Sequence, residues 1–229
     1  MYYPLQEIRQ KLLLIAAHLM HCPAEEVVFK EGRVFDRNDP GQDMPFSQVA
    51  AAAHNEELLP PGVTSGLDIT GSHTIPLSPY AFGAHVAVVE VSQDTGAVKI
   101  LKYVAVHDAG RIINPMLAEG QVQGAVAQGI GQALMEGMAY SPEGQPLTAT
   151  LMDYALPHAQ SMPDMTLETV ETPSPLNPLG SKGIGELPTV AAPVAVTNAV
   201  MDALAGAGVR HIDTPLTPEK IWHALHGNS

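Results

Sequence analysis

Apolar side chains recur at helical spacing near the start of the chain. They follow one another at intervals of three and four residues, at Leu5, Ile8, Leu12, Ile15 and Leu19. This spacing places them on one face of an α-helix. Pro4 suits the first turn of that helix, and Pro23 lies just beyond its end. The pattern therefore predicts an amphipathic helix over most of the first twenty residues.

Short strands and turns are predicted after this helix. The segment VVFKEGRVF, residues 27–35, is typical of a β-hairpin that turns at Glu31-Gly32. Ser47 is placed to cap a short helix over residues 48–54. These elements together form a small α/β piece.

A domain boundary is predicted at LLPPG, residues 58–62, because two consecutive prolines stop a helix or a strand. We expect residues 1–60 to be a helix-plus-hairpin segment, the tail of an upstream domain. Residues 61–229 are expected to form a second, larger domain.

The second domain mixes strands and helices. Residues 84–108 predict two strands rich in β-branched side chains, joined by a turn at 94–96. Asn114 and Pro115 are suited to the cap and first turn of a helix. Further strands are predicted at 147–157 and 165–172, and further helices at 190–204 and after Thr217-Pro218. Because strands and helices do not alternate strictly, the predicted fold class is α+β.

Composition and charge narrow the possible functions. Hydrophobic residues make up 45% of the chain and charged residues 15%, which indicates a folded globular protein. The net charge of −13 argues against nucleic-acid partners and anionic membrane surfaces. Cys22 is the only cysteine, so the chain alone builds neither a disulfide framework nor a cysteine-ligated cluster. The apolar run at 12–17 is too short to span a membrane, and we expect a cytoplasmic protein.

Glycine is unusually frequent in the helix predicted after Asn114. Gln121, Gly124, Gln128 and Gly131 follow at intervals of three, four and three, which places them on one helical face. Such a face lets a ligand approach the backbone closely while the amides offer donors and acceptors. Tight packing against another helix is the alternative interpretation, with the glutamines merely solvated.

A second candidate site is the loop GSKGIGE, residues 180–186. Its glycines permit unusual backbone angles and expose N–H groups suited to polar or anionic ligands, and Lys182 adds a positive charge. The order of residues is not that of a phosphate-binding P-loop. Glu186 precedes a predicted helix, whose dipole favours an ionised carboxylate there, and it is a candidate general base. The alternative is a common glycine turn with a surface or capping glutamate.

Side-chain metal ligands are not predicted. The histidine pairs are His18 with His21 and His223 with His226. Neither has a second pair of ligands at a workable distance in the sequence, so surface or partly buried histidines explain both.

Four segments together resemble a known family. They are residues 80–137, TLMDYALP at 150–157, ETPSPLNPLGSKGIGE at 171–186 and HIDTPLTPEKIW at 211–222. Their order and spacing resemble the molybdenum-binding subunit of the xanthine dehydrogenase family. The pattern is most similar to the branch of aerobic-type carbon monoxide dehydrogenase large subunits. The resemblance runs from about residue 3 to the end of the chain.

The resemblance implies a role for each candidate residue. It implies a molybdenum-molybdopterin cofactor, in the cytosine dinucleotide form, whose metal is held by the pterin and not by side chains. The implied cofactor-binding residues are Gln121, Gln128, Ser181, Lys182 and Gly183. Glu186 matches the catalytic glutamate of the family. The resemblance also implies partner subunits that carry a 2Fe-2S cluster and FAD.

The implied function is that of a molybdenum hydroxylase, which oxidises a small substrate with oxygen derived from water. Carbon monoxide, aldehydes and N-heterocycles are substrates within the family. Because the family's subunits are several times longer, the upstream half of the molybdenum subunit is a further expected partner. Two alternatives are an isolated fragment or assembly module without activity of its own, and a free-standing ligand-binding protein. An exposed apolar docking surface would favour the subunit interpretation over the last alternative.

Overall fold

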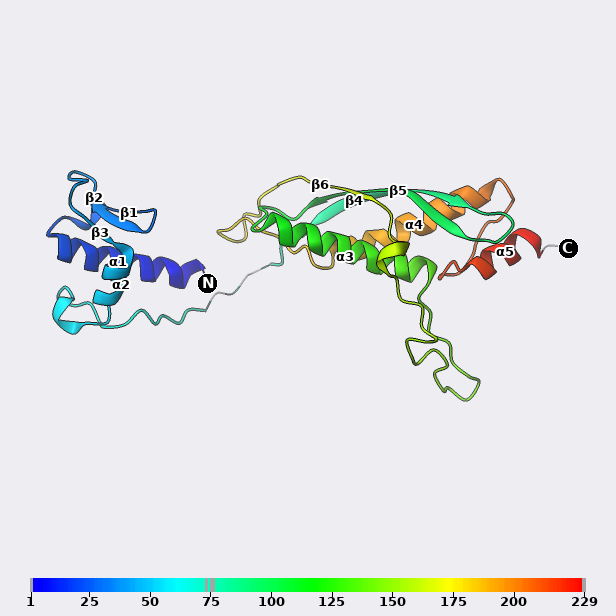
Figure 1. The fold of residues 1–229 in the computed structure, drawn as a ribbon, viewed down its shortest axis with the longest axis horizontal. Helices are drawn as coiled ribbons and strands as arrows, with labels where there is room; N and C mark the ends of the chain where they lie inside the picture. Colours follow the sequence, from blue (N-terminus) through cyan, green and yellow to red (C-terminus); the bar gives the residue numbers. More distant parts are fainter. Residues whose placement is uncertain (1, 73, 75–76, 228–229) are drawn as a thin grey trace. The chain divides into compact units, whose positions relative to one another are not determined.

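The computed structural model describes residues 2–72, 74 and 77–227, which fall into two compact units, residues 1–74 and 75–229 (Figure 1). The predicted boundary at 58–62 lies inside the first unit. Both units combine helices with strands, so the predicted α+β class is confirmed.

The first unit packs one long helix against a small antiparallel sheet. Its elements are α1 (Tyr2–Met20), η1 (Ala24–Glu26), β1 (Val27–Lys30), β2 (Arg33–Asp36), β3 (Asp43–Pro45), α2 (Phe46–Ala52) and η2 (Glu56–Leu58). The strands pair antiparallel in the order β1-β2-β3. Of the predicted apolar stripe, Leu12 and Ile15 are buried and Ile8 and Leu19 partly buried, whereas Leu5 is 58% exposed.

Two details of this unit test the sequence interpretation. The hairpin is confirmed, and its turn places Glu31 and Gly32 at φ angles of 51° and 75°. The predicted cap at Ser47 is wrong, because α2 begins at Phe46, two residues before the predicted start, and its N-cap position is Pro45. Pro45 ends β3, so the chain turns directly from strand to helix and Ser47 falls in the first helical turn.

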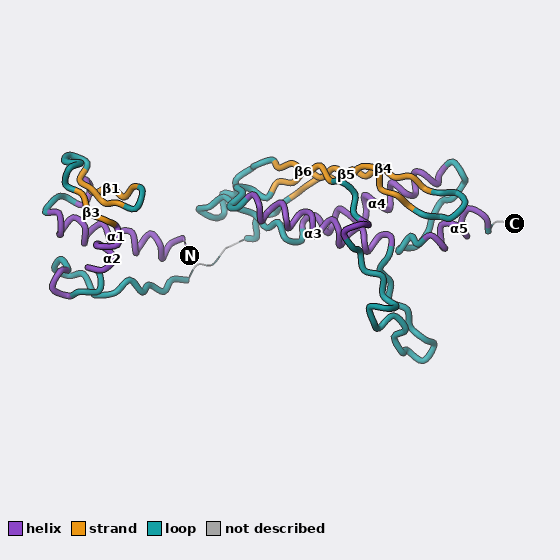
Figure 2. The backbone as a smooth tube through the Cα atoms, in the orientation of Figure 1, coloured by secondary structure: helices purple, strands orange, loops and turns teal. Residues whose placement is uncertain are grey.

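The second unit is built on the sheet β4 (Phe82–Val91), β5 (Val98–Asp108) and β6 (Met165–Thr169). Strands β4 and β5 form a long antiparallel hairpin, and β6 pairs parallel to β5 at the edge. Parallel strands need a crossover, which here includes α3 (Pro115–Leu134) and η3 (Ala159–Ser161). Helices α4 (Leu187–Ala205) and α5 (Pro218–His226) complete the unit. Figure 2 shows α3 and α4 on the same side of this sheet.

The core of this unit lies between the sheet and helices α3 and α4. Val126 and Ile130 from α3 meet Val196 and Val200 from α4, and all four are fully buried. The two helices approach closely at Gly129, where an added Cβ would lie 2.5 Å from the Ala192 Cβ. The predicted cap at Asn114 is confirmed, since its side chain accepts a backbone N–H. Thr217, at the predicted start of the last helix, caps α5 in the same way.

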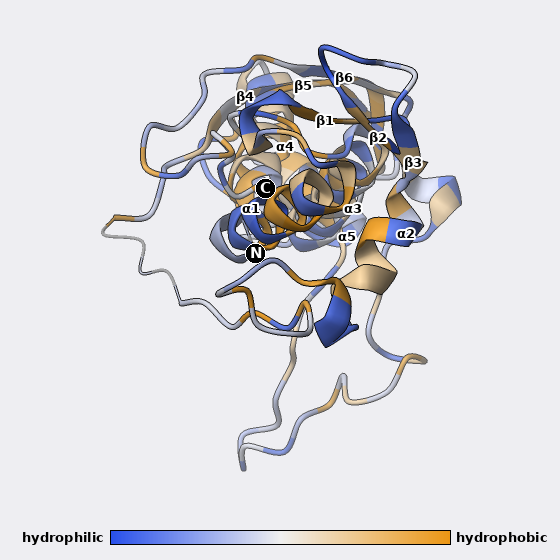
Figure 3. Ribbon diagram, turned by 90° about the vertical axis from the view of Figure 1, so that its left-hand side faces the viewer, coloured by the Kyte–Doolittle hydropathy of each residue, from blue (hydrophilic) through white to orange (hydrophobic). Residues whose placement is uncertain are grey.

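Helix α4 is apolar along most of its length (Figure 3). By length and composition alone its 19 residues pass as a candidate membrane span. Five of them, Pro188, Ala192, Val196, Val200 and Leu204, are buried inside the unit. This buried stripe belongs to the core, whereas Val190 and Val194 on the outer side of the helix are 75% and 57% exposed.

The opposite face of the sheet carries exposed apolar side chains, beside the charged residues Glu90, Lys99 and Lys102. Outward positions on β4 and β5 are occupied by Phe82, Val86, Val88 and Leu101, whose exposed fractions run from 47% to 59%. The outward face of a solvated antiparallel sheet is normally polar. This face therefore has the composition of a surface that another part of an assembly covers.

The strand predicted at 147–157 is wrong. These residues form turns within an irregular arm, residues 138–158, that extends away from the sheet (Figure 1). Its regular pairing among described residues is a single bridge between Tyr140 and Pro146. Leu151 and Met152 are 80% and 94% exposed. Their β-forming composition has no neighbouring strand to pair with in this chain.

Candidate functional site

The glycine-rich loop 180–186 is fixed to the end of β5. Gly110 and Ser181 form an isolated β-bridge. The Lys182 amide donates to the Ala109 carbonyl at 2.8 Å, and the Arg111 amide donates to the Gly180 carbonyl at 2.9 Å. Gly110 has a φ of 65°, and a Cβ there would collide with the Gly180 carbonyl oxygen. This close backbone approach therefore requires glycine.

A buried ion pair reinforces the same junction. Lys182 Nζ lies 3.1 Å from Asp108 Oδ1, and the two side chains are 8% and 0% exposed. The Gly110 amide donates to the same oxygen at 2.7 Å. Burial acts to raise the pKa of Asp108, but hydrogen bonding from Thr172, the Gly110 amide and Lys182 outweighs it and holds that pKa below its usual range. The Lys182 charge is thus engaged within the protein.

A cavity of about 260 Å³ lies between this loop and α3. Its walls include Gln121 from α3 and both Ser181 and Lys182 from the loop. The structure therefore brings three of the predicted cofactor-binding residues to one cavity. Arg111 and Asn114, which sequence reasoning did not single out as ligands, also line it.

The other candidate residues lie beside this cavity and not in its walls. Gln128 Oε1 accepts a hydrogen bond from Thr189 in the first turn of α4, at 3.4 Å. A Cβ at Gly185 would lie 3.8 Å from Gln121 Oε1. Gly185 and Thr189, one residue before and three residues after Glu186, thus face Gln121 and Gln128. Glu186 occupies the N-cap position of α4 without a capping hydrogen bond, and it is exposed, as is Gly183.

The glycines of α3 divide into two groups. Gly129 and Gly131 are buried, and a Cβ on Gly131 would lie 2.9 Å from the Pro157 ring. Gly120 and Gly124 are exposed, and a Cβ on either would meet nothing within 4 Å. Close packing therefore explains the glycines in the second half of α3. The first half presents open backbone beside the Gln121 amide, which fits a polar heterocycle such as a pterin.

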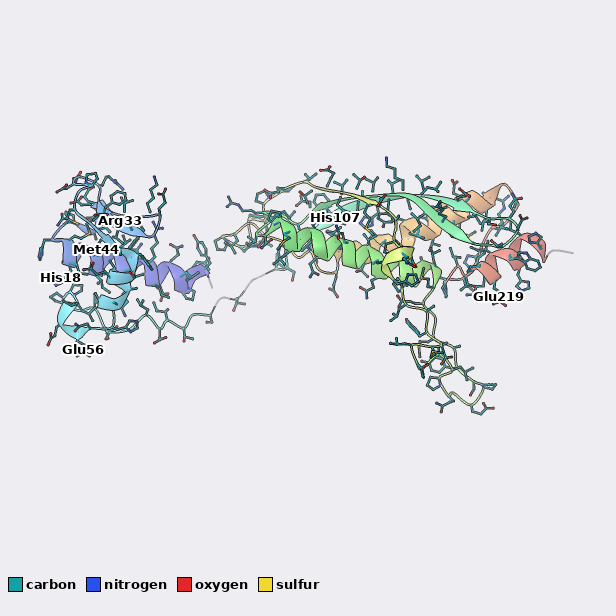
Figure 4. All side chains as sticks on the ribbon, in the orientation of Figure 1. His18, Arg33, Met44, Glu56, His107 and Glu219 are labelled. Carbon is teal, nitrogen blue, oxygen red and sulfur yellow. The ribbon has the colours of Figure 1, made fainter. Side chains whose placement is uncertain are left out.

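Sequence reasoning missed a buried histidine chain beneath the sheet. His85 Nε2 lies 2.7 Å from His107 Nε2, and His85 Nδ1 lies 2.7 Å from the Tyr103 hydroxyl. Burial lowers the pKa of His107, and burial together with His107 lowers the pKa of His85 to about 4. Figure 4 marks His107 between the sheet and α3. The available signal was strand alternation, which places all three side chains on the inward face.

Metal ligation by side chains has no candidate in the described part of the chain. No group of three or more His, Cys, Asp and Glu residues there is arranged to hold a metal ion.

Comparison with known proteins identifies the class of this fold and site. The sequence matches the family described as molybdopterin cofactor-binding domain over residues 4–163. The chain belongs to this family, within the molybdenum-binding subunits of the xanthine dehydrogenase family of oxidoreductases.

The sequences of individual relatives align with nearly the whole chain. It is 36% identical over 221 residues to the nicotine 6-hydroxylase large subunit of Paenarthrobacter nicotinovorans, and 33% identical over 220 residues to the carbon monoxide dehydrogenase large chain of Hydrogenophaga pseudoflava. Each match covers 96% of this chain and 27% of the relative. The chain thus spans about a quarter of the length of these relatives.

Solved structures confirm the fold. Quinoline 2-oxidoreductase from Pseudomonas putida 86 aligns with a TM-score of 0.84 and 39% identity, over 96% of this chain and 28% of that chain. The Cu,Mo-CO dehydrogenase in its carbon monoxide reduced state aligns with a TM-score of 0.85 and 31% identity, over the same shares of the two chains.

Proposed function

We propose that this chain forms the part of a molybdenum hydroxylase large subunit that closes one side of the molybdopterin site. The observation that carries this proposal is the cavity where Gln121 meets Ser181 and Lys182, in a chain of the molybdopterin-binding family. The assembled enzyme would oxidise a small substrate with oxygen derived from water. Substrates of the kinds named in its relatives, carbon monoxide or an N-heterocycle such as quinoline, are the proposed class.

The proposed cofactor is molybdenum-molybdopterin in its cytosine dinucleotide form. When bound, it supplies a metal that accepts the electrons of the substrate. The Gln121 amide bonds the pterin, and Gln128, held by Thr189, lies two helical turns further along α3. Ser181 and Gly183 offer a hydroxyl and an exposed backbone to the same group. Lys182 holds the loop in place through Asp108, because its ammonium group is already paired.

Glu186 is the proposed general base. Its carboxylate lies at the N-terminus of α4, where the helix dipole stabilises negative charge. Its exposure leaves the carboxylate oxygens accessible to a reactant placed against the loop. There it would take the proton from the attacking oxygen, a role that typically contributes about 10²–10⁴-fold to the rate.

Further protein is required for activity under this proposal. The exposed apolar sheet face and the arm 138–158 are surfaces that the rest of the large subunit would cover. Residues 1–60 would then be the tail of the upstream domain. The proposed partners are the upstream half of the subunit, an iron–sulfur subunit with a 2Fe-2S cluster and an FAD subunit, all in the cytoplasm. Electrons would leave the site through the last two.

A non-catalytic assembly module with the same fold is the second candidate. The observation in its favour is that Glu186 is exposed and does not line the cavity. In that case the loop and α3 would organise a neighbouring chain without taking part in the reaction.

Reconstitution tests both candidates. The 229-residue chain is co-expressed with the upstream three-quarters of a related large subunit and its partner subunits, and bound molybdenum, pterin and turnover are measured. Gln121→Ala should lower pterin content, whereas Gln123→Ala, on the same helix, should not. Glu186→Gln should retain the cofactor and lose most turnover, whereas Glu143→Gln on the arm should keep both. Full turnover in Glu186→Gln would favour the assembly module.

A further inference from the structure

Strand β4 forms a free edge of the sheet in the second unit. It runs over ten residues, Phe82–Val91, and pairs along one side with β5. Its other side has no neighbouring strand in this sheet, because the strand order is β4-β5-β6. Among the described residues, no further group forms a hydrogen bond with the β4 backbone. The edge therefore presents a row of unpaired N–H and C=O groups.

Alternation along β4 indicates which amides face this edge. The Ser92 amide, one residue past the strand, donates across the hairpin to the Ala97 carbonyl at 2.9 Å. Because the backbone direction reverses at each residue of a strand, the N–H groups of His85, Ala87 and Val89 point to the free edge. The bulge in the β4–β5 pairing leaves this alternation intact, since its extra residue is on β5.

The edge lacks the common devices that prevent further pairing. Edge strands of soluble proteins are usually short or carry lysine or proline. Strand β4 is long, contains neither lysine nor proline, and has Glu90 as its one acidic or basic side chain apart from His85. Its outward positions include Val86 and Val88, which are 59% and 47% exposed. A strand of this composition is a template for the addition of another strand.

Burial of the core is also incomplete along this edge. On the central strand β5, the inward side chains of Tyr103 and Ala105 are fully buried. The inward side chains of Ala87 and Val89 on β4 pack against the same core but are only partly buried. A neighbour beside β4 would therefore bury apolar surface as well as pair the backbone.

We propose that β4 is the docking edge for an extended strand from the part of the large subunit that lies outside this chain. This inference rests on the proposed function and names the element through which the upstream partner joins. That partner has length to supply a strand, since this chain spans about a quarter of its relatives. A helix would cover the outward face, whereas a strand also satisfies the unpaired backbone groups. Outward side chains of the added strand would be apolar, beside Val86 and Val88.

Residue-resolved hydrogen exchange tests the proposal. The full 229-residue chain is measured alone and in complex with the upstream three-quarters of a related large subunit. Alone, the amides of His85, Ala87 and Val89 should exchange rapidly, whereas those of Val86 and Val88, directed at β5, should exchange slowly. In the complex, the first three should slow by at least about tenfold. This alternating pattern is specific to strand pairing.

The outcomes separate this inference from the proposed function. A complex that binds pterin while His85, Ala87 and Val89 still exchange rapidly would overturn strand addition and leave the proposed function standing. A complex that protects these amides without binding pterin would support strand addition and count against the proposed function. A second copy of the chain is the rival occupant. A dimer of the isolated chain in sedimentation, with the three amides already protected, would contradict the proposal.

Variants at Val86 provide a second measurement. Val86→Lys places on an exposed outward position the charge that natural edges use against pairing, and it should weaken association with the upstream part by about fivefold. Val86→Thr keeps the β-branched shape without the charge, so this matched control should associate within about twofold of the parent. Slow exchange across β5 in both isolated variants verifies that they fold. Association of Val86→Lys equal to that of the parent would refute docking at this edge.

Discussion

The two halves of α3 carry the same residue type for opposite reasons. In the second half, Gly129 lets α4 approach so closely that an added Cβ would lie 2.5 Å from the Ala192 Cβ. In the first half, Gly124 has nothing within 4 Å of that position. A glycine-rich helix therefore does not indicate one function. In the packed half of α3, glycine permits close contact with α4. In the open half, glycine leaves the backbone accessible to a ligand or another chain.

The open half is nevertheless well anchored. Its cavity is completed by the loop 180–186, which is tied to β5 by backbone hydrogen bonds and by the buried pair of Lys182 and Asp108. At the packed end of the unit, stability depends on how well side-chain volumes fit. At the end that holds the site, stability depends on the ion pair of Lys182 and Asp108. Substitutions at the two ends should therefore fail in different ways, and Trp222, the sole tryptophan, reports unfolding of this unit.

The largest effect is expected from Lys182→Met. It leaves the Asp108 carboxylate buried without its cation, which typically costs about 3–5 kcal/mol of unfolding free energy. Denaturant unfolding followed by Trp222 fluorescence measures the loss. Lys99→Met, the same substitution at an exposed position, should unfold close to the parent. A small loss in Lys182→Met would show that the site end does not depend on this charge.

A smaller loss is expected from Gly129→Ala at the packed end. The added methyl would meet both Ala192 and Pro193, at 2.5 Å and 2.9 Å, so α3 and α4 must separate. Overpacking of this kind costs about 1–3 kcal/mol. The same unfolding measurement applies, and Gly129→Ala should leave the salt dependence of stability unchanged. A neutral result would mean that the crossing is looser than the contact distances indicate.

Much of the fold could be predicted because periodicity is a local signal. The apolar stripe of α1, the β4–β5 hairpin and the cap at Asn114 all follow from neighbouring residues. The strand predicted at 147–157 failed because a strand also needs a partner. Its side chains have strand-forming composition, but this chain offers them no edge to pair with.

The site was less accessible to sequence reasoning because its contacts are distant in the chain. Lys182 was interpreted as a charge for a ligand, yet its partner Asp108 lies 74 residues away. The contact between His85 and His107 likewise depends on the register of β4 and β5 and on the orientation of the two imidazole rings. Local patterns singled out Gln121 and the loop, and the resemblance gave them roles. No local pattern separated the exposed Gly124 from the buried Gly131, which share one predicted helical face.

Acid should destabilise the second unit through the histidine chain. The folded pKa of His85, about 4, lies below the ordinary value of 6.5, so the unfolded state binds a proton that the native state does not. Stability is therefore present above pH 6.5 and is lost as the pH falls toward 4. Allowing for partial exposure, we expect about 1 kcal/mol less between pH 7 and pH 5.

The pH dependence should be flatter in the double variant His85→Gln, His107→Gln. His158→Gln, at an exposed position in the same unit, is the control and should keep the slope of the parent. An unchanged slope in the double variant would mean that other groups titrate in this window and that the buried pair does not.

The smallest effect is expected from Gly124→Ala, and its sign is opposite to that of Gly129→Ala. An exposed glycine inside a helix costs about 0.5–1 kcal/mol relative to alanine, and the new methyl at residue 124 would meet nothing within 4 Å. The isolated chain should therefore become more stable. If the open half of α3 serves a bound group, the same variant should lower pterin content in the reconstituted enzyme. A gain in stability together with full pterin content would show that the exposed backbone at Gly124 does not contact the cofactor. The two halves of α3 would then differ only in how tightly they pack.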